Sequence, residues 1–521
     1  MIISLALTSK WDLMCGPFGI IPDQPNSDLL IAWVDQQTVQ NTAMNPFCHD
    51  DGKKTYVNDR GMHWLIAAFF LIGDIAGGGL VALPAALNNT GIYIGMIMFV
   101  VITVVSSYTA SALGENWVIL LKRWPEYRTH CRKPYPEMGY RGLGRKMRRI
   151  VSYCVNATQF SIATVYLLLS SQIIQNALEL LFQVRISFCW MLVVVALCLL
   201  PVTMLKSPAD FWYIVMGAML TTAVAVVFIL VGIAYDSVEC AQNATHNLVE
   251  VNTVLIGVGT FFFSYGGHAA FPTIQHDMKQ PHLFGRASKV AFFLVTLIYA
   301  PVSIVGYFTY GSNLTDSVLD SIQSQIVQTV GNSLIAIHCI LTLTIVMNPL
   351  NQEVEELFKL PHEFGKERIF FRSLMMFAIV LVAETIPNFG PLLNLVGGST
   401  IALTAIIFPC VFNLCLKIRD KSLQNGEDDM PTLRSILYES TCCDLFINGL
   451  IILFGIALGI AATYSAILDL STTHFTVPCY LRPVIASSAG GQNTSAVFGL
   501  ARCCGPHQNI SVFGKPENCM L

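Results

Sequence analysis

Long apolar stretches follow one another along most of this 521-residue chain. A helix needs about 20 mainly apolar residues to cross a bilayer. Eleven stretches approach that length, at roughly 62–86, 91–113, 150–178, 188–205, 211–235, 253–275, 288–309, 328–350, 370–386, 392–416 and 446–468. Only 12% of the residues are charged and the mean hydropathy is +0.58, whereas soluble domains carry about 25% charged residues. The sequence therefore predicts an all-α integral membrane protein with about 11 transmembrane helices.

The apolar stretches divide the chain into three parts. We expect a cytoplasmic segment over 1–60, a transmembrane domain over 61–468 and an extracellular or luminal, cysteine-containing tail over 469–521. Basic residues give the orientation, because loops rich in Lys and Arg stay on the cytoplasmic side. With the N-terminus inside, 26 of the 30 Lys and Arg residues fall on the inner side. The C-terminus is then external.

Glycosylation motifs agree with this orientation. N-x-S/T sequons on the predicted outer side begin at Asn88, Asn243, Asn313, Asn493 and Asn509. Asn88 is expected to lie too close to the membrane, which leaves the other four as predicted glycosylation sites. Asn156 also begins a sequon, but it lies within the third span.

Five of the 16 cysteines fall on the predicted outer side, where disulfides form. They are Cys240, Cys479, Cys503, Cys504 and Cys519. Pairing cannot be read from their spacing. The cysteines of the spans and the inner side are expected to be reduced packing residues.

The first span contains a local conflict with helix formation. Residues 77–84 read GGGLVALP, and Asp74 lies three residues before them. Glycine costs about 1 kcal/mol and proline about 3 kcal/mol in a helix interior. We therefore expect this helix to break near its middle, next to a carboxyl group.

The sixth span repeats the pattern. GGLVALP at 78–84 aligns without a gap with GGHAAFP at 266–272, so each glycine pair is followed by a proline at the same spacing. Matching Gly/Pro interruptions in spans 1 and 6 are expected of two inverted repeats of five spans, and they point to a transporter binding site. Ordinary kinks or small-residue helix contacts are the alternative.

A helix break inside a membrane has chemical consequences. The freed backbone groups must be satisfied by protein or water, because hydrocarbon cannot pair with them. The N–H groups that open the second half-helix attract a carboxylate, and the freed carbonyl groups attract a cation or an ammonium. A zwitterionic amino acid matches both ends.

These features together resemble the amino acid/auxin permease family over roughly residues 60–468. The resemblance rests on the eleven spans, the cytoplasmic N-terminus, GGGLVALP in span 1 and SYGGHAAFP at 264–272 in span 6. It implies a LeuT-like core of five plus five spans with broken helices 1 and 6, followed by an added eleventh helix. It also implies alternating access and coupling to protons or sodium.

The resemblance also implies a set of substrate-binding residues. They are Gly77, Gly78 and Gly79 in span 1 and Ser264, Tyr265, Gly266 and Gly267 in span 6. Span 3 would add Tyr166 or Gln159. Span 8 offers Thr342 and Thr344, which point to different faces of a helix. We name Tyr166 and Thr344 as the candidates.

Asp74 is the sharpest functional candidate. Carboxylates inside a membrane are costly and mark ion or proton paths. Because a low-dielectric site favours the neutral acid, Asp74 is predicted to load and release the coupling proton. A sodium ligand, a partner for the substrate's ammonium and a packing carboxyl are the alternatives. His268 is a second ion-coupling candidate because it follows the span-6 glycines and can titrate, although it could equally bond a backbone carbonyl. His338, in span 8, is read as a packing residue.

Several function classes lack their motifs in this sequence. It has no P-loop, no G-x-S-x-G or H-E-x-x-H motif and no zinc-type Cys/His spacing. We therefore expect no enzymatic activity, no metal, no cofactor beyond a coupling ion and no nucleic-acid partner.

The predicted function is secondary active transport of amino acids, small neutral ones by preference, in symport with protons. Sodium coupling and a transporter-like amino acid sensor without significant flux are the alternatives. The predicted partners are the substrate and the lipid bilayer, and the sequence identifies no protein partner. A plasma membrane is expected, with a lysosomal or vesicular membrane as the alternative.

Overall fold

A computed structural model describes residues 47–50, 53–59, 61–129, 131, 133–184, 186–204, 212–246, 248–358, 360, 365–472, 478–481, 503–504 and 510–511. The predicted 1–60 segment and the 469–521 tail therefore lie largely outside the described residues. The strands of the described part are short and pair as β1 with β2 and β3 with β4.

The elements follow one another in this order: β1 (Phe47–Asp50), β2 (Lys53–Tyr56), α2 (Trp64–Ile75), α3 (Gly78–Thr90), α4 (Ile92–Arg123), η1 (Pro125–Arg128), α5 (Pro134–Leu143), α6 (Arg145–Phe182), α7 (Phe188–Thr203), α8 (Trp212–Asn243), α9 (Val251–Ser264), α10 (Phe271–His276), η3 (Pro281–Leu283), α11 (Phe284–Tyr310), η4 (Gly311–Asn313), η5 (Val318–Ser321), α12 (Gln325–Leu357), α13 (Lys366–Thr385), α14 (Phe389–Val396), the π-helix η6 (Gly397–Ile407), α15 (Phe408–Gln424), α16 (Leu433–Glu439), α17 (Cys442–Thr472), η7 (Cys479–Leu481), β3 (Cys503–Cys504) and β4 (Ile510–Ser511).

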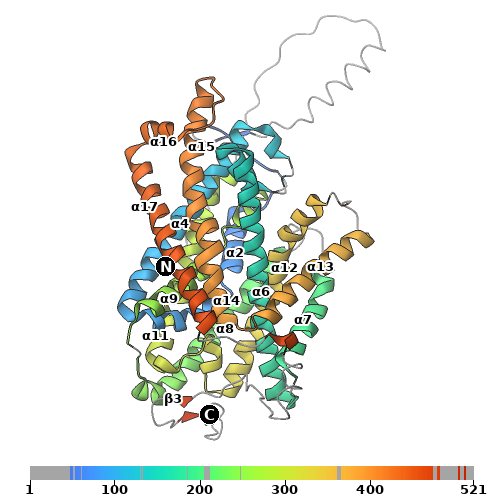
Figure 1. Cartoon of the computed structure of the whole chain (residues 1–521), viewed down its shortest axis with the longest axis vertical. Coiled ribbons are helices and arrows are strands. Elements are labelled where there is room, and N and C mark those ends of the chain that lie inside the picture. The colour runs from blue at the N-terminus through green and yellow to red at the C-terminus, as the bar shows by residue number, and fades with distance from the viewer. Residues whose placement is uncertain are drawn as a thin grey trace, which may run out of the picture. The chain divides into compact units, whose positions relative to one another are not determined.

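Each predicted span coincides with a helix or with a helix interrupted by a break. Among the described residues, seven helices are long and apolar enough to cross a membrane, and the bent pair α2 and α3 makes an eighth candidate. Helices α7 and α9 are apolar but shorter. In Figure 1 the long helices α6, α15 and α17 run along the vertical axis of the view. The all-α membrane fold is confirmed, and the number of eleven spans stays a prediction.

The two interrupted spans pack against each other at the centre of the helical core. Helix α3 lies along α9, while α12 lies along α6 and α8. Glycines allow η6 to approach α9 closely, because a Cβ at Gly397 would lie 1.9 Å from the carbonyl oxygen of Gly259. Aromatic rings fill the space beside these contacts, as where Phe99 meets Phe261 edge to face at 5.0 Å.

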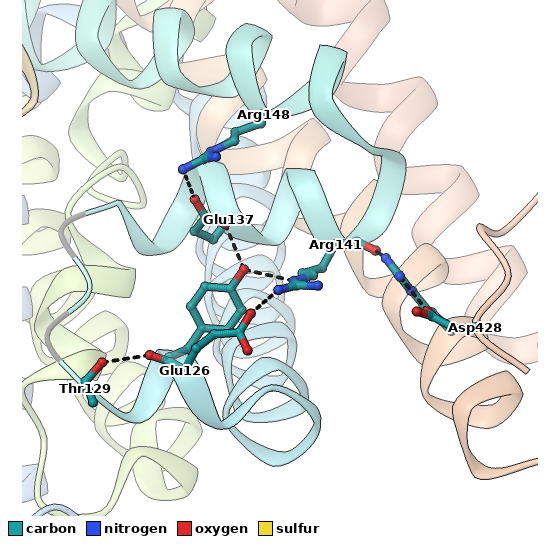
Figure 2. A network of polar contacts seen from close by, with 8 residues as sticks. Glu126, Thr129, Glu137, Arg141, Arg148 and Asp428 are labelled. Atoms are coloured by element: carbon teal, nitrogen blue, oxygen red, sulfur yellow. Dashed lines mark hydrogen bonds and ion pairs between the residues drawn. The ribbon is translucent and has the colours of Figure 1, made fainter. Parts of the chain in front are cut away.

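The segment between α4 and α6, in a region where ten Lys and Arg residues lie between Lys122 and Arg149, is an ordered structure. The Tyr127 hydroxyl donates to Glu137 (2.8 Å) and accepts from Nε of Arg141 (2.9 Å). Burial raises the pKa of Tyr127, so the hydroxyl stays a donor. Figure 2 shows this network extending through ion pairs of Arg148 with Glu137 and of Arg141 with Glu126. These ion pairs and hydrogen bonds hold α5 against η1 at the end of α4. The basic residues also favour the cytoplasmic side of the membrane for this segment.

A short backbone clasp joins the chain before span 1 to the chain after α10. Met62 N–H donates to the Asp277 carbonyl (2.8 Å), and Lys279 N–H donates to the Met62 carbonyl (2.7 Å). Asn58 N–H adds a bond to the Lys279 carbonyl (2.9 Å). Gly61 permits the contact, since a Cβ there would lie 2.4 Å from the backbone of Met278. We call residues 58–62 and 277–279 the clasp.

A disulfide corrects one expectation about the cysteines. Cys189, at the start of α7, is bonded to Cys479 of the tail. The expectation that the cysteines of the spans, Cys189 among them, are reduced packing residues is therefore wrong for Cys189. The assumed start of span 4 at residue 188 placed this thiol inside the membrane, whereas it lies in the first turn of α7, within reach of the tail. Cys240 is also disulfide-bonded.

The sequons fall in different settings. Asn88 is buried within α3, consistent with its omission from the predicted glycosylation sites. Asn313 is half-buried in η4, and Asn243 is the last residue of α8. Asn493 and Asn509 lie outside the described residues.

Candidate functional site

Both predicted breaks are present. Helix α2 ends at Ile75, α3 begins at Gly78, and the two helices meet at 55°. Helix α9 ends at Ser264 and α10 begins at Phe271. The first interruption therefore lasts two residues and the second six. In span 1 the glycine pair Gly78 and Gly79 opens α3, whereas the equivalent pair in span 6, Gly266 and Gly267, lies within the interruption. Equivalent motifs therefore give breaks of unequal length.

Glycines bring the two breaks into contact. A Cβ at Gly79 would lie 2.6 Å from Cα of Ser264, and a Cβ at Gly267 would lie 2.7 Å from Oδ2 of Asp74. A side chain at position 79 would meet backbone, and one at position 267 would displace the Asp74 carboxylate. Four sequence candidates, Asp74, Gly79, Ser264 and Gly267, therefore meet at one place.

Hydroxyl groups from neighbouring helices satisfy carbonyl oxygens freed by the breaks. The buried Tyr299 hydroxyl of α11 lies 2.8 Å from the Ile75 carbonyl oxygen and 3.2 Å from that of Ser264. It thus donates toward the last carbonyl groups of both α2 and α9. The Tyr166 hydroxyl of α6 lies 3.4 Å from the Asp74 carbonyl oxygen. These contacts meet the requirement that a broken membrane helix be satisfied within the protein.

A second polar cluster lies on the other side of the first break. A Cβ at Gly77 would lie 2.7 Å from the Tyr166 hydroxyl and 2.9 Å from Nε2 of His338. His338 is fully buried and is 3.2 Å from Oγ1 of Thr342. Thr344, the named candidate, instead donates to the Ile340 carbonyl of its own helix (3.2 Å). Of the two threonines, Thr342 is thus the one that faces the first break.

The remaining candidates lie around these two clusters. Gly78 faces the rings of Tyr166 and Phe389, and Gly266 faces Ile401. The Tyr265 hydroxyl lies 3.1 Å from Oγ1 of Thr296. Gln159 is buried on α6.

His268 faces α4 instead of the first break. Its Nε2 lies 3.0 Å from Oγ1 of Thr109 and 3.1 Å from the Ser106 carbonyl oxygen. Within the described residues, its Nδ1 is buried without a hydrogen-bond partner. Its contacts match the backbone-bonded alternative and do not test an ion-coupling role.

Three residues at the site were not found from the sequence. Tyr299 and Thr222 contact the breaks from α11 and α8, and Asn394 of α14 accepts a bond from Thr260 (2.5 Å). In the sequence, these residues stand out only as polar residues inside apolar spans. Many other positions share this feature, so it does not single them out. Among the described residues, no group of three or more His, Cys, Asp or Glu side chains could hold a metal ion.

Comparison with known proteins identifies the family. Residues 60–436 match the family model described as transmembrane amino acid transporter protein. The chain belongs to this family. Transporter AVT1J of Arabidopsis thaliana is 26% identical, over 77% of this chain and 90% of the relative. Lysine histidine transporter-like 4 of the same plant is 23% identical, over 69% of this chain and 82% of the relative.

The fold of this family member resembles that of a protein of solved structure. MhsT, crystallised in complex with L-phenylalanine, aligns with a TM-score of 0.52 at 10% identity, over 78% of this chain and all of MhsT. The similarity supports the LeuT-like architecture predicted from the paired breaks. The protein is thus a multi-pass membrane protein of an amino acid transporter family, and its relatives are transporters and not enzymes.

Proposed function

We propose that this protein is a secondary active transporter that symports small neutral amino acids with protons by alternating access. The position of Asp74 carries the proposal. Its carboxylate lies against Gly267, where the two broken spans meet. A proton bound there changes the charge at the junction whose halves must separate when access alternates. Asp74 is therefore the proposed coupling group.

The substrate preference follows from the charges near the breaks. Half-helix ends and freed backbone groups suit the carboxylate and ammonium groups of an amino acid. Around the breaks, the described residues are glycines, residues with hydroxyl groups or aromatic rings and the buried His338, with Asp74 as the acidic group. Such surroundings favour a small, uncharged substrate side chain.

We further propose a cytoplasmic N-terminus and an external C-terminal tail, at the plasma membrane. The distribution of Lys and Arg supports this orientation. The disulfide between Cys189 and Cys479 supports it as well, because disulfides persist on the oxidising side of a membrane.

Uptake of a labelled amino acid mixture into cells that express the chain tests the proposal. It is measured at external pH 5.5 and 7.5, with sodium present or replaced by choline. Acid-stimulated, sodium-independent uptake is expected. Sodium-dependent uptake would leave amino acid transport in place and overturn proton coupling. No uptake with surface expression confirmed would favour an internal membrane or the sensor alternative.

Asp74→Asn tests the coupling residue. The amide has nearly the same shape but cannot carry the proton, so uptake is expected to lose its acid stimulation. A tenfold proton gradient supplies about 1.4 kcal/mol, and the variant should no longer use this driving force. Unchanged pH dependence in Asp74→Asn would remove Asp74 from the mechanism.

A further inference from the structure

Two adjacent cysteines begin the last long helix of the described structure. Cys442 and Cys443 are the first residues of α17, and both are exposed and free. We infer that they are a site of S-acylation, at which each thiol receives the fatty acyl group of a long-chain acyl-CoA. Of the proposed function, this inference uses only the orientation, which puts the start of α17 at the cytoplasmic face. It departs from the expectation that the inner cysteines are packing residues.

The two ends of α17 lie on opposite sides of the membrane. Its 31 residues extend about 45 Å, which exceeds the hydrocarbon thickness of about 30 Å. Cys479, beyond the carboxyl end of α17, is disulfide-bonded to Cys189, and disulfides persist on the oxidising side of a membrane. Cys442 and Cys443 begin the helix at its other end. They therefore lie on the reducing side, where thiols stay free and acyl-CoA is present.

Both thiols lie on the lipid-facing side of α17. Residues three and four apart share one face of a helix, so Cys443 and Cys442, three and four residues before Phe446, share its face. The exposed apolar residues of α17 continue this face as one stripe, formed by Phe446, Leu450, Leu453, Ile460, Tyr464 and Ile467. An acyl chain on either sulfur can therefore run along the stripe into the hydrocarbon.

Charged groups place the thiols at the membrane surface. Lys417 of α15 forms an ion pair with Asp444 (3.2 Å), in the same turn of α17 as the cysteines. Lys421 donates to the Glu439 carbonyl (3.1 Å). The Asp444 N–H donates to the Thr441 hydroxyl (3.2 Å), which caps this first turn. Because charges are costly in hydrocarbon, the turn lies among the headgroups, and the thiols can meet both the cytosol and the membrane.

The short helix α16 presents apolar side chains beside this turn. Leu433, Leu437 and Tyr438 are 74%, 53% and 81% exposed, and the two leucines lie one turn apart on one face. In Figure 1, α16 lies beside α15 at the end of the helical core where α17 begins. The cytoplasmic leaflet covers such a face when the helix lies in the interface. Cysteines next to a membrane span and an interfacial helix are the setting of reversible S-acylation.

Acyl transfer to these thiols needs no oxidant or reductant. The cysteine thiolate is the nucleophile, and its sulfur attacks the carbonyl carbon of the acyl-CoA thioester. A new carbon–sulfur bond forms to the cysteine as the bond to CoA breaks. The CoA thiolate leaves and takes up the proton that the cysteine released. The product is a thioester, which hydroxylamine cleaves, whereas a disulfide is not cleaved by hydroxylamine.

The test measures thioesters on the full chain expressed in eukaryotic cells. Free thiols are blocked with N-ethylmaleimide, thioesters are cleaved with hydroxylamine, and each freed thiol is tagged with maleimide-polyethylene glycol. We expect two hydroxylamine-dependent mass steps in the wild type, one in Cys442→Ser or Cys443→Ser, and none in the double variant. Cys198→Ser, at an exposed free cysteine within the apolar stretch of α7, is the matched control and should keep both steps.

Two results would overturn the inference: no mass step in the wild type, or steps that persist in the double variant. N-glycosidase treatment of the same samples reports the orientation, because the predicted glycosylation sites all lie on the outer side. A glycosidase shift without a hydroxylamine step would overturn S-acylation and leave the orientation in place. Absence of both shifts would overturn S-acylation together with the proposed orientation, so the two failures are distinguishable.

Discussion

The glycines at the breaks act through the absence of a side chain. Gly77, Gly79 and Gly267 are not among the described residues with positive φ. Each of them instead lies where a Cβ would come within 3 Å of a neighbouring group. The Asp74 carboxylate and the Ser264 backbone can approach the opposite break, and the His338 ring can approach the first break, because these glycines have no side chain.

Gly79→Ala should separate the two broken spans. Its methyl group would lie 2.6 Å from Cα of Ser264, and backbone cannot move as cheaply as a side chain. We expect a destabilisation of about 1–3 kcal/mol and a loss of most transport, measured by a thermal melt in detergent and by uptake. Gly449→Ala is the control, since nothing lies within 4 Å of its added Cβ. Equal melting temperatures and uptake rates in the two variants would contradict the contact between Gly79 and Ser264.

At the scale of elements, one tyrosine ties the two broken spans together. The Tyr299 hydroxyl on α11 reaches the last carbonyl groups of both α2 and α9. A helix outside the breaks thereby satisfies backbone groups that the breaks expose. Residues 58–62 and 277–279 form a second link, the clasp, at the other ends of α2 and α10.

Tyr299→Phe should weaken the first of these links. The Ser264 carbonyl loses this donor, whereas the Ile75 carbonyl still accepts from the Gly77 N–H (2.9 Å), and the expected cost is about 1–3 kcal/mol. The melting temperature and the uptake rate should both fall, whereas Tyr307→Phe, on the same helix, should leave both nearly unchanged. A Tyr299→Phe variant as stable and active as the wild type would show that water replaces the hydroxyl.

The clasp is expected to depend on pH through Asp277. Burial raises the pKa of this carboxyl from 3.8 to about 6. Well below pH 3.8 the group is neutral whether the clasp is closed or open, so burial costs little. As the pH rises through 6, the closed clasp must bury a charge that the open one exposes to water, and it weakens.

Hydrogen exchange of the Met62 and Lys279 amides measures this effect. Corrected for intrinsic exchange, protection in the wild type should be lower at pH 7 than at pH 5. Asp277→Asn should remove the difference, because the amide does not ionise. A pH dependence that persists in the variant would assign it to another group.

The breaks were predictable from the sequence, and most of their surroundings were not. Glycine and proline act locally, so GGGLVALP and SYGGHAAFP indicated both interruptions from the chain alone. Whether Tyr299, Thr222 and His338 reach the first break depends on which face of an apolar helix turns inward. Uniformly apolar spans carry no periodicity that reports this, and the three residues contact the first break from positions 146 to 261 residues further along the chain.

At the scale of the whole molecule, the disulfide fixes part of the tail to the helical core. Cys189 and Cys479 are separated by 290 residues, so the bond closes a very long loop. It also places residue 479 beside the start of α7. The predicted external tail is therefore attached to the transmembrane domain at this point.

Cys479→Ser should lower stability without changing the site. Disulfides of this kind stabilise by about 2–4 kcal/mol, which should appear as a lower melting temperature, while uptake at low temperature stays near wild type. Cys198→Ser, at an exposed free cysteine on the same helix as Cys189, is the control. Equal melting temperatures for the two variants and the wild type would mean that the bond does not form in the native protein.

The unequal lengths of the two breaks make the halves of the protein mechanically different. Two residues between α2 and α3 leave a stiff joint that transmits rotation from one half-helix to the other. Six residues between α9 and α10 leave a compliant one, and α10 itself spans only six residues. In the alternating-access cycle proposed above, the sixth span would absorb most of the deformation while the first turns as a lever. The side of the membrane governed by α10 would then open with the smaller elastic cost.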